Sequence, residues 1–293
     1  MSFFTTPSND RKEDPSSKLT IDQDTGRLST SSRESDIPPA YNDAVGGSSS
    51  PYSFPTTGQL QIQAVGFDYN SALIGSKLET ISVDRVETGQ PEYTSIRLKR
   101  SSNSCALVSA SDRNQTPLIS TIYRWGPGRH PRMRIFPANT SVSVEDAINA
   151  DKVECELIDV KSRSMLSRAQ KFDTSFGSFE WRYGSRGERK EDHDASSLLI
   201  LERTDSVASA AGAKAGKRGV RVAQLVRSDE FRTPGTTRYM GGNGGRLMMD
   251  LSLWTDDKKA AAKDVEAFVV ASCICMLKRE ADRFRDNTIA AVV

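Results

Sequence analysis

Cysteine and histidine, the residues that form disulfides and most often bind metals, are scarce in this chain. Among its 293 residues there are only four cysteines and two histidines. The cysteines are Cys105, Cys155, Cys273 and Cys275. They do not form the dense disulfide framework of a small secreted domain, so a reducing, intracellular environment is expected. His130 and His193 match no Cys/His zinc spacing, so we expect no metal and no cofactor.

Long apolar runs and an excess of one charge are also lacking. The longest apolar run, residues 267–277, has about 11 residues, whereas a membrane-spanning helix needs about 20. No secretory apolar region comes after Met1, so no signal peptide is expected. Net charge is +2, which excludes a simple polyanion-binding protein. These absences predict a cytoplasmic protein that is at most peripheral at membranes.

Apolar residues are too few for the whole chain to fold. They make up 37% of the sequence, and residues 1–58 consist mainly of Ser, Thr, Pro, Asp and Gly without any apolar period. Such a segment cannot offset an ordering entropy of about 1–2 kcal/mol per residue. We therefore expect a disordered tail over 1–58 and one folded domain over 59–293, with a flexible internal loop at 204–219.

Beyond residue 58 the sequence contains a series of short strand-like runs separated by Gly, Pro, Asn and Ser. About eleven strands are predicted, at 60–64, 77–84, 93–99, 105–109, 118–125, 133–136, 153–160, 178–183, 197–202, 220–226 and 247–254. Apart from one short turn of helix at 146–151, no helical pattern lies between them, which argues against a parallel βαβ sheet. The pattern indicates an antiparallel sandwich or barrel.

One strong helix is predicted near the end of the chain. Residues 264–277 are apolar on almost every side and precede the charged stretch 278–283. A helix that is apolar all round must be buried all round, and this one is too short to cross a bilayer. A β-barrel that encloses a central helix over 264–287 meets both conditions.

The tail contains a short recognition motif. Pro38, Pro39 and Tyr41 form a PPxY sequence, in which the prolines favour the polyproline II conformation that WW domains bind. HECT-type ubiquitin ligases carry WW domains that recognise such ligands. The competing interpretation is a chance tetrapeptide in a proline-containing tail. We take a WW-domain protein as the predicted partner.

Basic residues gather in three places, at 124–134, 182–190 and 214–221, and arginines of the first two are candidates for binding an anion or an anionic lipid. The candidates are Arg124, Arg129, Arg132 and Arg134 in one group, and Arg182 and Arg186 in the other. Acidic neighbours such as Glu188 and Glu191 favour the alternative of an ordinary solvated face. No aromatic residues alternate with these arginines in the manner of a nucleic-acid stacking platform, so no nucleic-acid partner is expected.

Catalytic motifs are not found. There is no GxSxG sequence and no paired Cys–His or Ser–His–Asp arrangement, so we expect no enzyme activity. The glycine-rich loop 241–245 does not match GxGxxG and precedes a strand pattern, which indicates a hairpin turn rather than a phosphate-binding loop.

The tail, the strands at 179–182 and 198–201 and the helix at 269–280 together resemble fungal proteins of unknown function. Those proteins are similar to the tubby C-terminal-like superfamily, which includes LURP-one-related proteins and phospholipid scramblases. The resemblance implies a closed antiparallel barrel of about twelve strands around a central apolar helix. In tubby proteins the barrel binds phosphoinositide headgroups, but no residue here matches that site individually, so the site is not carried over to this chain. The cysteine-rich and calcium-ligand segments of scramblases are not seen.

These observations leave three functions open. The leading hypothesis is a non-catalytic, monomeric adaptor whose tail recruits a WW-domain protein and whose barrel binds an anionic headgroup or a protein. The second is a scramblase-like membrane-active protein, which requires the final helix to insert into lipid. The third is an enzyme of unrecognised type, which requires a cavity with converging polar groups.

The PPxY motif generates the first prediction. A peptide of residues 36–45 should bind WW domains of ubiquitin ligases at micromolar affinity, about −8 kcal/mol, because the two prolines limit the entropy lost on docking. Tyr41→Ala should abolish binding, measured by fluorescence anisotropy, without changing the melting temperature of the full chain. If a panel of such WW domains ignores the wild-type peptide, the motif is a coincidence of composition.

Overall fold

The structure is a computed structural model that describes residues 54–67, 80–99, 101–124, 130–163, 167–191, 193–205, 219–254 and 259–292. For residues 259–261 and 288–292 it describes the backbone alone. All of these residues belong to one compact unit, Ser48–Val293. Pro38, Pro39, Tyr41 and the core of the predicted loop at 204–219 lie outside the described residues.

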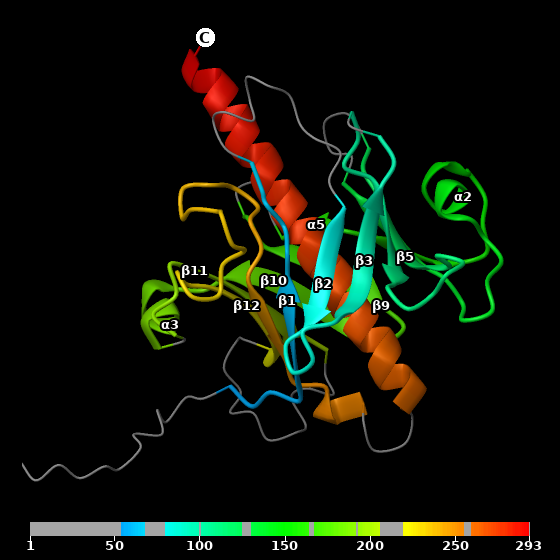
Figure 1. Cartoon of the computed structure of the whole chain (residues 1–293), viewed down its shortest axis with the longest axis horizontal. Coiled ribbons are helices and arrows are strands. Elements are labelled where there is room, and N and C mark those ends of the chain that lie inside the picture. Colours follow the sequence, from blue (N-terminus) through cyan, green and yellow to red (C-terminus); the bar gives the residue numbers. More distant parts are fainter. Residues whose placement is uncertain are drawn as a thin grey trace, which may run out of the picture. The chain divides into compact units, whose positions relative to one another are not determined.

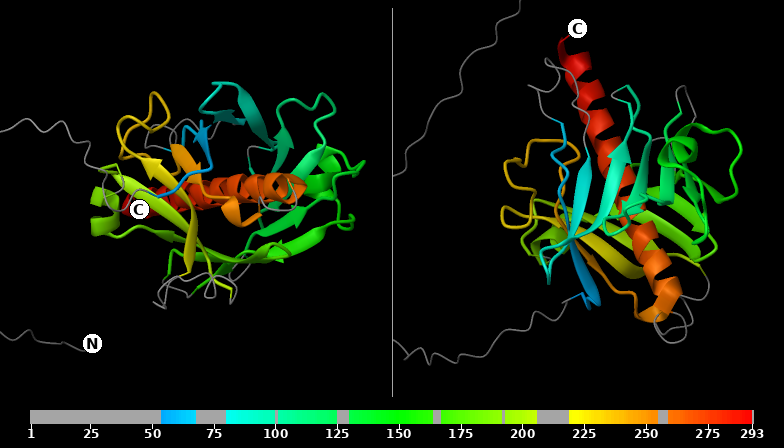
Figure 2. Two further views of the ribbon diagram at one scale, coloured as in Figure 1. Left: turned by 90° about the horizontal axis from the view of Figure 1, so that it is seen from below. Right: turned by 45° about the vertical axis from the view of Figure 1, so that its right-hand side comes forward.

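Thirteen antiparallel strands form a single sheet that curls into a nearly closed barrel (Figures 1 and 2). In chain order they are β1 (Gly58–Ile62), β2 (Ile81–Arg85), β3 (Pro91–Arg97), β4 (Cys105–Ser109), β5 (Pro117–Ile122), β6 (Arg132–Ile135), β7 (Glu156–Asp159), β8 (Lys161–Ser162), β9 (Gln170–Thr174), β10 (Gly177–Tyr183), β11 (Ser197–Arg203), β12 (Val220–Arg227) and β13 (Arg246–Met249). The order across the sheet is β7-β6-β5-β4-β3-β2-β1-β13-β12-β11-β10-β9-β8. The predicted all-β barrel is confirmed.

The barrel closes where its two edge strands are consecutive in the chain. β7 and β8 are the two ends of the strand order, yet only Val160 separates them. Val160 is fully buried, and its N–H donates to Pro131 O at 3.0 Å. The Glu156 carboxylate bridges the seam by accepting from the backbone N–H and the hydroxyl of Ser175, both at 2.7 Å. One buried residue thus turns a sheet with two edges into a ring with a narrow seam.

Helix α5 (Lys259–Val292) passes through the barrel, with β1–β3 on one side and β9–β12 on the other (Figures 1 and 2). Every residue from 265 to 278 is buried, in agreement with a helix that is apolar all round. Phe268 packs on Phe172 and Phe179 with ring centroids 5.9 and 5.2 Å apart. No helix of the described residues is long and apolar enough to cross a membrane.

Polar contacts set the position of α5 along the barrel axis. Near its start, Glu266 accepts from both terminal nitrogens of Arg85 on β2, at 2.6 and 3.2 Å, and from the Tyr93 hydroxyl at 3.0 Å. In the middle, the indole N–H of Trp181 donates to the Ser272 hydroxyl at 2.9 Å. These partners are satisfied at one helix register only.

The second bidentate pair lies where α5 leaves the barrel. Arg227 on β12 is almost fully buried and donates to both oxygens of Glu280, at 2.6 and 3.1 Å. The same guanidinium donates to the side-chain oxygen of Asn243 at 3.0 Å and to the Ser197 hydroxyl at 2.7 Å. Asn243 belongs to the glycine-rich loop, so helix, strand and loop share one buried polar centre.

Close packing explains the glycines of that loop. A Cβ at Gly242, whose φ is +77°, would lie 2.4 Å from the Leu277 carbonyl, and one at Gly244 would lie 1.9 Å from the Ile62 carbonyl. The loop therefore packs its backbone directly against α5 and β1. It belongs to the long connection 228–245 between β12 and β13, so the expected tight hairpin turn is replaced by a packing loop.

Two strands and one helix lie where no element was expected. β9 reads Gln-Lys-Phe-Asp-Thr, and a single apolar side chain, Phe172, faces inward beside the buried Gln170. β8 has two residues. Neither strand shows a detectable alternation of apolar and polar residues in its sequence. The third unexpected element is helix α3 (Arg186–Glu191). The short helix predicted at 146–151 is present as α2 (Val144–Asn149), which starts two residues earlier. α5 likewise extends past both ends of the range expected for the final helix, 264–287.

The buried helix generates the second prediction. Val270→Asp should cause aggregation or a melting temperature far below the wild type, because an unpaired buried carboxylate costs several kcal/mol. Circular dichroism melts of the full chain measure the change. Leu157→Asp is the control, because Leu157 is about half exposed on β7. Wild-type melting of Val270→Asp would contradict the enclosed helix.

Candidate functional site

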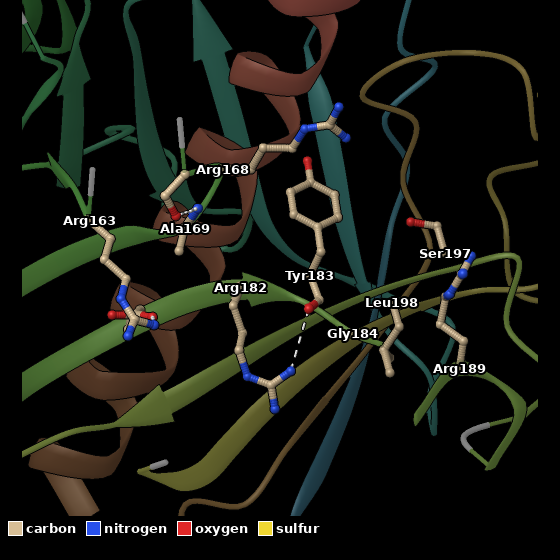
Figure 3. Close-up of a pocket in the computed structure, with 11 residues that line it drawn as sticks. Arg163, Arg168, Ala169, Arg182, Tyr183, Gly184, Arg189, Ser197 and Leu198 are labelled. Carbon is tan, nitrogen blue, oxygen red and sulfur yellow. Dashed lines mark hydrogen bonds and ion pairs between the residues drawn. The ribbon is translucent and has the colours of Figure 1, made fainter. Parts of the chain in front are cut away.

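A pocket of about 460 Å³ opens beside the end of β10 (Figure 3). Its lining includes Arg163, Arg168, Arg182 and Arg189 with one carboxylate, Glu180. We call this hollow the arginine pocket. β10 supplies Glu180 and Arg182, the connection from β8 to β9 supplies Arg163 and Arg168, and α3 supplies Arg189. Three separate elements thus place arginines around one hollow, with Arg163 and Arg189 on opposite sides of Arg182 (Figure 3).

Helix α3 holds Arg189 through a capping box. The Glu188 N–H donates to the Ser185 hydroxyl at 3.3 Å, and the Ser185 N–H donates back to the Glu188 carboxylate at 2.8 Å. This reciprocal pair satisfies backbone donors at the helix start. The sequence Ser185-Arg186-Gly187-Glu188 carries the S-x-x-E signature. A helix of this length is marginal by itself, so the box and the contacts of Glu188 stabilise it.

Arg182 is the structural centre of the pocket wall. Its guanidinium donates to both oxygens of Glu188, at 2.7 and 3.0 Å, and twice to Glu202, at 2.6 and 2.9 Å. A further contact to the Tyr183 carbonyl at 3.4 Å completes the set (Figure 3). Every nitrogen of this predicted ligand-binding arginine therefore has an acceptor within the protein. Its role in the structure is to join β10, β11 and α3.

The pKa of the Glu188 carboxylate is strongly lowered by this environment. Burial raises the pKa of Glu188, but hydrogen bonds from Arg182 and Ser185 outweigh it and hold that pKa at about 2, below the ordinary value of 4.5. Glu188 therefore remains ionised at every physiological pH. The Arg182–Glu188 contact is a permanent part of the pocket wall.

Two other arginines of the pocket keep unused donors. Arg189 donates one terminal N–H to the Ser196 carbonyl at 3.1 Å, while its Nε is buried without a hydrogen-bond acceptor among the described residues. The guanidinium of Arg168 lies 5.9 Å from the centre of the Tyr183 ring and makes no ion pair with a described carboxylate. The other terminal nitrogens of these two guanidinium groups are therefore the donors available to a ligand.

Arg163 stands at the open side of the pocket. Its side chain is 64% exposed and pairs with Glu180 at 3.2 Å, while the Glu180 side chain is 9% exposed. Only Arg163 is exposed in this pair, so it offsets the charge of a nearly buried carboxylate, together with Lys171 at 4.0 Å from the other oxygen. The remaining donors of Arg163 face the open side of the pocket.

The other predicted arginines lie elsewhere. Arg132 and Arg124 share Asp159, at 2.8 and 3.9 Å, and Arg134 donates to the Ala147 carbonyl of α2 at 3.2 Å. Arg129 lies outside the described residues. Arg186 is exposed on α3 and does not line the pocket. β7, β8 and β9 separate β6 from β10 around the barrel, so the structure does not join the two predicted groups in one pocket.

Sequence reasoning missed Arg163 and Arg168 as site residues. They occupy the connection between the two strands that lack a detectable pattern, so nothing placed them beside β10. Arg189 belongs to the second basic cluster of the sequence, with Arg182, Arg186 and Lys190, but is not among the predicted site residues. The S-x-x-E signature at 185–188 was the available signal, because it predicts the helix that carries Arg189.

Comparison of the chain with models of known protein families, with curated proteins and with solved structures gave no match. The geometry of the arginine pocket is therefore the feature from which we infer a function. Its uncompensated donors are suited to an anion with several acceptor oxygens.

The pKa of Glu188 generates the third prediction. Because its folded pKa is below the ordinary value, the carboxylate stabilises the fold above about pH 4.5, and this contribution is lost as pH falls toward 2. Glu188→Gln should lower the melting temperature at pH 7, and the difference from the wild type should shrink between pH 4.5 and 2. Glu145→Gln, at an exposed position on α2, is the control and should show little difference at any pH. A difference for Glu188→Gln that is independent of pH would contradict the assignment.

Proposed function

We propose that this chain is a non-catalytic binding protein whose barrel binds a phosphate ester in the arginine pocket. The observation that carries the proposal is the lining of the arginine pocket, in which four arginines, Arg163, Arg168, Arg182 and Arg189, accompany a single carboxylate, Glu180. Guanidinium groups form charge-assisted, bidentate hydrogen bonds with phosphate oxygens. A phosphate in the pocket would contact only one end of its wall, because Figure 3 shows Arg163 and Arg189 on opposite sides of Arg182 and Tyr183.

The size and openness of the pocket favour a headgroup over a fully enclosed metabolite. Its volume of about 460 Å³ lies in the lower part of the range for small-molecule sites, about 300–1,000 Å³. Arg163 is largely exposed at its edge, so part of the ligand would remain in solvent. A phosphorylated headgroup whose remainder stays outside fits this arrangement. The resemblance to tubby-like proteins favours the same class of ligand.

The tail completes the proposed role. Pro38, Pro39 and Tyr41 would recruit a WW-domain protein, such as a ubiquitin ligase, while the barrel holds the chain at a phosphorylated surface. Two binding elements on one chain raise the effective concentration of one partner beside the other. We therefore propose an adaptor rather than an enzyme.

The position of α5 disfavours the scramblase-like alternative. Residues 265–278 are buried by the barrel, and bidentate pairs hold Glu266 and Glu280. Insertion of this helix into lipid would require both pairs to break and the barrel core to open. Binding at the surface of the barrel requires neither.

The fourth prediction tests the pocket. The full chain should sediment with phosphatidylcholine vesicles that contain a phosphatidylinositol monophosphate, and less binding should remain at high salt because exposed charges are screened. Arg189→Gln should weaken binding about tenfold or more, since a charge-assisted hydrogen bond contributes about 1.5–3 kcal/mol.

Arg113→Gln is the matched control, because Arg113 lies between β4 and β5, away from the pocket. Phosphatidylserine vesicles separate a specific headgroup from general negative charge. Equal binding to phosphatidylcholine alone, or an Arg189→Gln variant that folds and binds like the wild type, would overturn the proposed pocket.

A further inference from the structure

A second hollow, of about 170 Å³, lies where the connection from β3 to β4 meets the later turns of α5. Three arginines line it, together with two serines of that connection: Arg97, Arg124, Arg285, Ser101 and Ser102. We call it the loop pocket. It shares no lining residue with the arginine pocket, and β3 and β10 lie on opposite sides of α5 (Figures 1 and 2). The two hollows are therefore separate.

The connection itself, residues 98–104, is fixed by side-chain hydrogen bonds in its second half. The Asn103 amide donates to both carboxylate oxygens of Asp282 on α5, at 2.7 and 2.8 Å. The Ser102 hydroxyl donates to the Ser104 hydroxyl at 2.9 Å, and the Ser102 carbonyl accepts from the Nε of Arg97 at 2.7 Å. This half of the connection is thus held against the helix, directly after the exposed residue 101.

Ser101 has the exposure and the sequence context of a kinase substrate. The residue is exposed, and its hydroxyl makes no hydrogen bond to any described residue. In the sequence it directly follows Lys99 and Arg100, of which Arg100 lies outside the described residues. Kinases select substrates by charge pattern, and an acidic substrate groove selects a serine that follows basic residues. The order Lys-Arg-Ser therefore fits a basophilic serine kinase.

Arg285 is placed to receive a phosphate in the loop pocket. Its side chain is 41% exposed and lies 3.4 Å from Asp282 and 3.6 Å from Asp286. Charge-assisted hydrogen bonds are shorter, about 2.7–2.9 Å, and Arg285 makes none to a described residue. Its donors are therefore open to a phosphate, which accepts from a guanidinium in a bidentate manner.

Two carboxylates of the loop pocket, those of Asp282 and Asp286, oppose an added negative charge. The three arginines of the lining outnumber these two carboxylates. Asp282 is also a weak competitor for Arg285. Burial raises the pKa of Asp282, Asn103 already donates to it, and a nearby phosphate would raise that pKa further. The balance of charge in the pocket therefore favours the phosphate.

We propose that Ser101 is a phosphorylation site for a basophilic serine kinase and that its phosphate group binds Arg285. The Ser101 hydroxyl oxygen attacks the γ-phosphorus of ATP, the bond from that phosphorus to the β–γ bridging oxygen breaks, and ADP leaves. The hydroxyl proton passes to the carboxylate base of the kinase. The product carries a charge of about −1.5 to −2 at pH 7 and would tie the connection to α5 beside Asn103. This inference is independent of the arginine pocket and of its ligand.

Kinase treatment of the full chain tests the site. Protein kinase A or protein kinase C, which both prefer basic residues near the serine, should phosphorylate Ser101 in most chains with Mg²⁺ and ATP, as located by mass spectrometry. Ser101→Ala, treated in the same way, accounts for phosphates elsewhere in the chain. Ser111 is the internal control, because it is also exposed but has no basic residue among positions 106–110. If both kinases leave Ser101 unmodified, or modify Ser102 in its place, the proposed site is wrong.

Melting curves test the contact with Arg285. Phosphorylation should raise the melting temperature of the wild type by about 3–6 °C, the effect of one or two added charge-assisted hydrogen bonds in a domain of this size. Arg285→Gln should be phosphorylated equally but lose this rise. Arg285→Lys should keep part of it, because lysine retains the charge without the bidentate geometry.

Arg113→Gln is the matched control, since it removes an exposed arginine from the connection between β4 and β5 and should keep the full rise. If Arg285→Gln fails to fold, the partial rise expected for Arg285→Lys decides. A melting temperature that is unchanged or lower after phosphorylation of the wild type would overturn the contact. A full rise that persists in the Arg285 variants would overturn it as well.

Discussion

The fold depends on one constraint, which is that a helix without a polar face must be enclosed on all sides. Residues 265–278 of α5 are buried without interruption. Each fully buried large side chain, such as Phe268 or Ile274, contributes about 1.5–3 kcal/mol when it leaves water. One sheet that packs on one face of the helix would leave the opposite face exposed. A sheet that curls around the helix covers every face, and the near-closure at Val160 meets this requirement.

Enclosure alone does not set where along its length the helix is held. An apolar cylinder could slide by one turn without losing much buried area. The two bidentate pairs, Arg85–Glu266 and Arg227–Glu280, prevent such a shift because each carboxylate has its partner at one position only. Buried ion pairs of this kind contribute little net stability, since desolvation offsets their attraction. Their main effect is on register.

The candidate site arises where the barrel is least regular. Around the seam, β8 is very short and its connection to β9 carries Arg163 and Arg168 over the end of β10. Arg182 uses its donors to join β10, β11 and α3, which leaves Arg168 and Arg189 to face the pocket. One arginine thus organises the wall, and its neighbours remain available for a ligand.

The sequence by itself determined the class of fold, the buried helix and most of the strands. These features depend on local periodicity and on the absence of a polar helix face, both of which can be read from adjacent residues. It also contained the S-x-x-E signal for α3. Only the tertiary structure decided which arginines line one pocket, because Arg168, Arg182 and Arg189 come from a loop, a strand and a short helix. It also decided that Arg182 is already satisfied and that β8 and β9 complete the ring, since a strand with one inward apolar side chain is formed by its neighbours rather than by its own pattern.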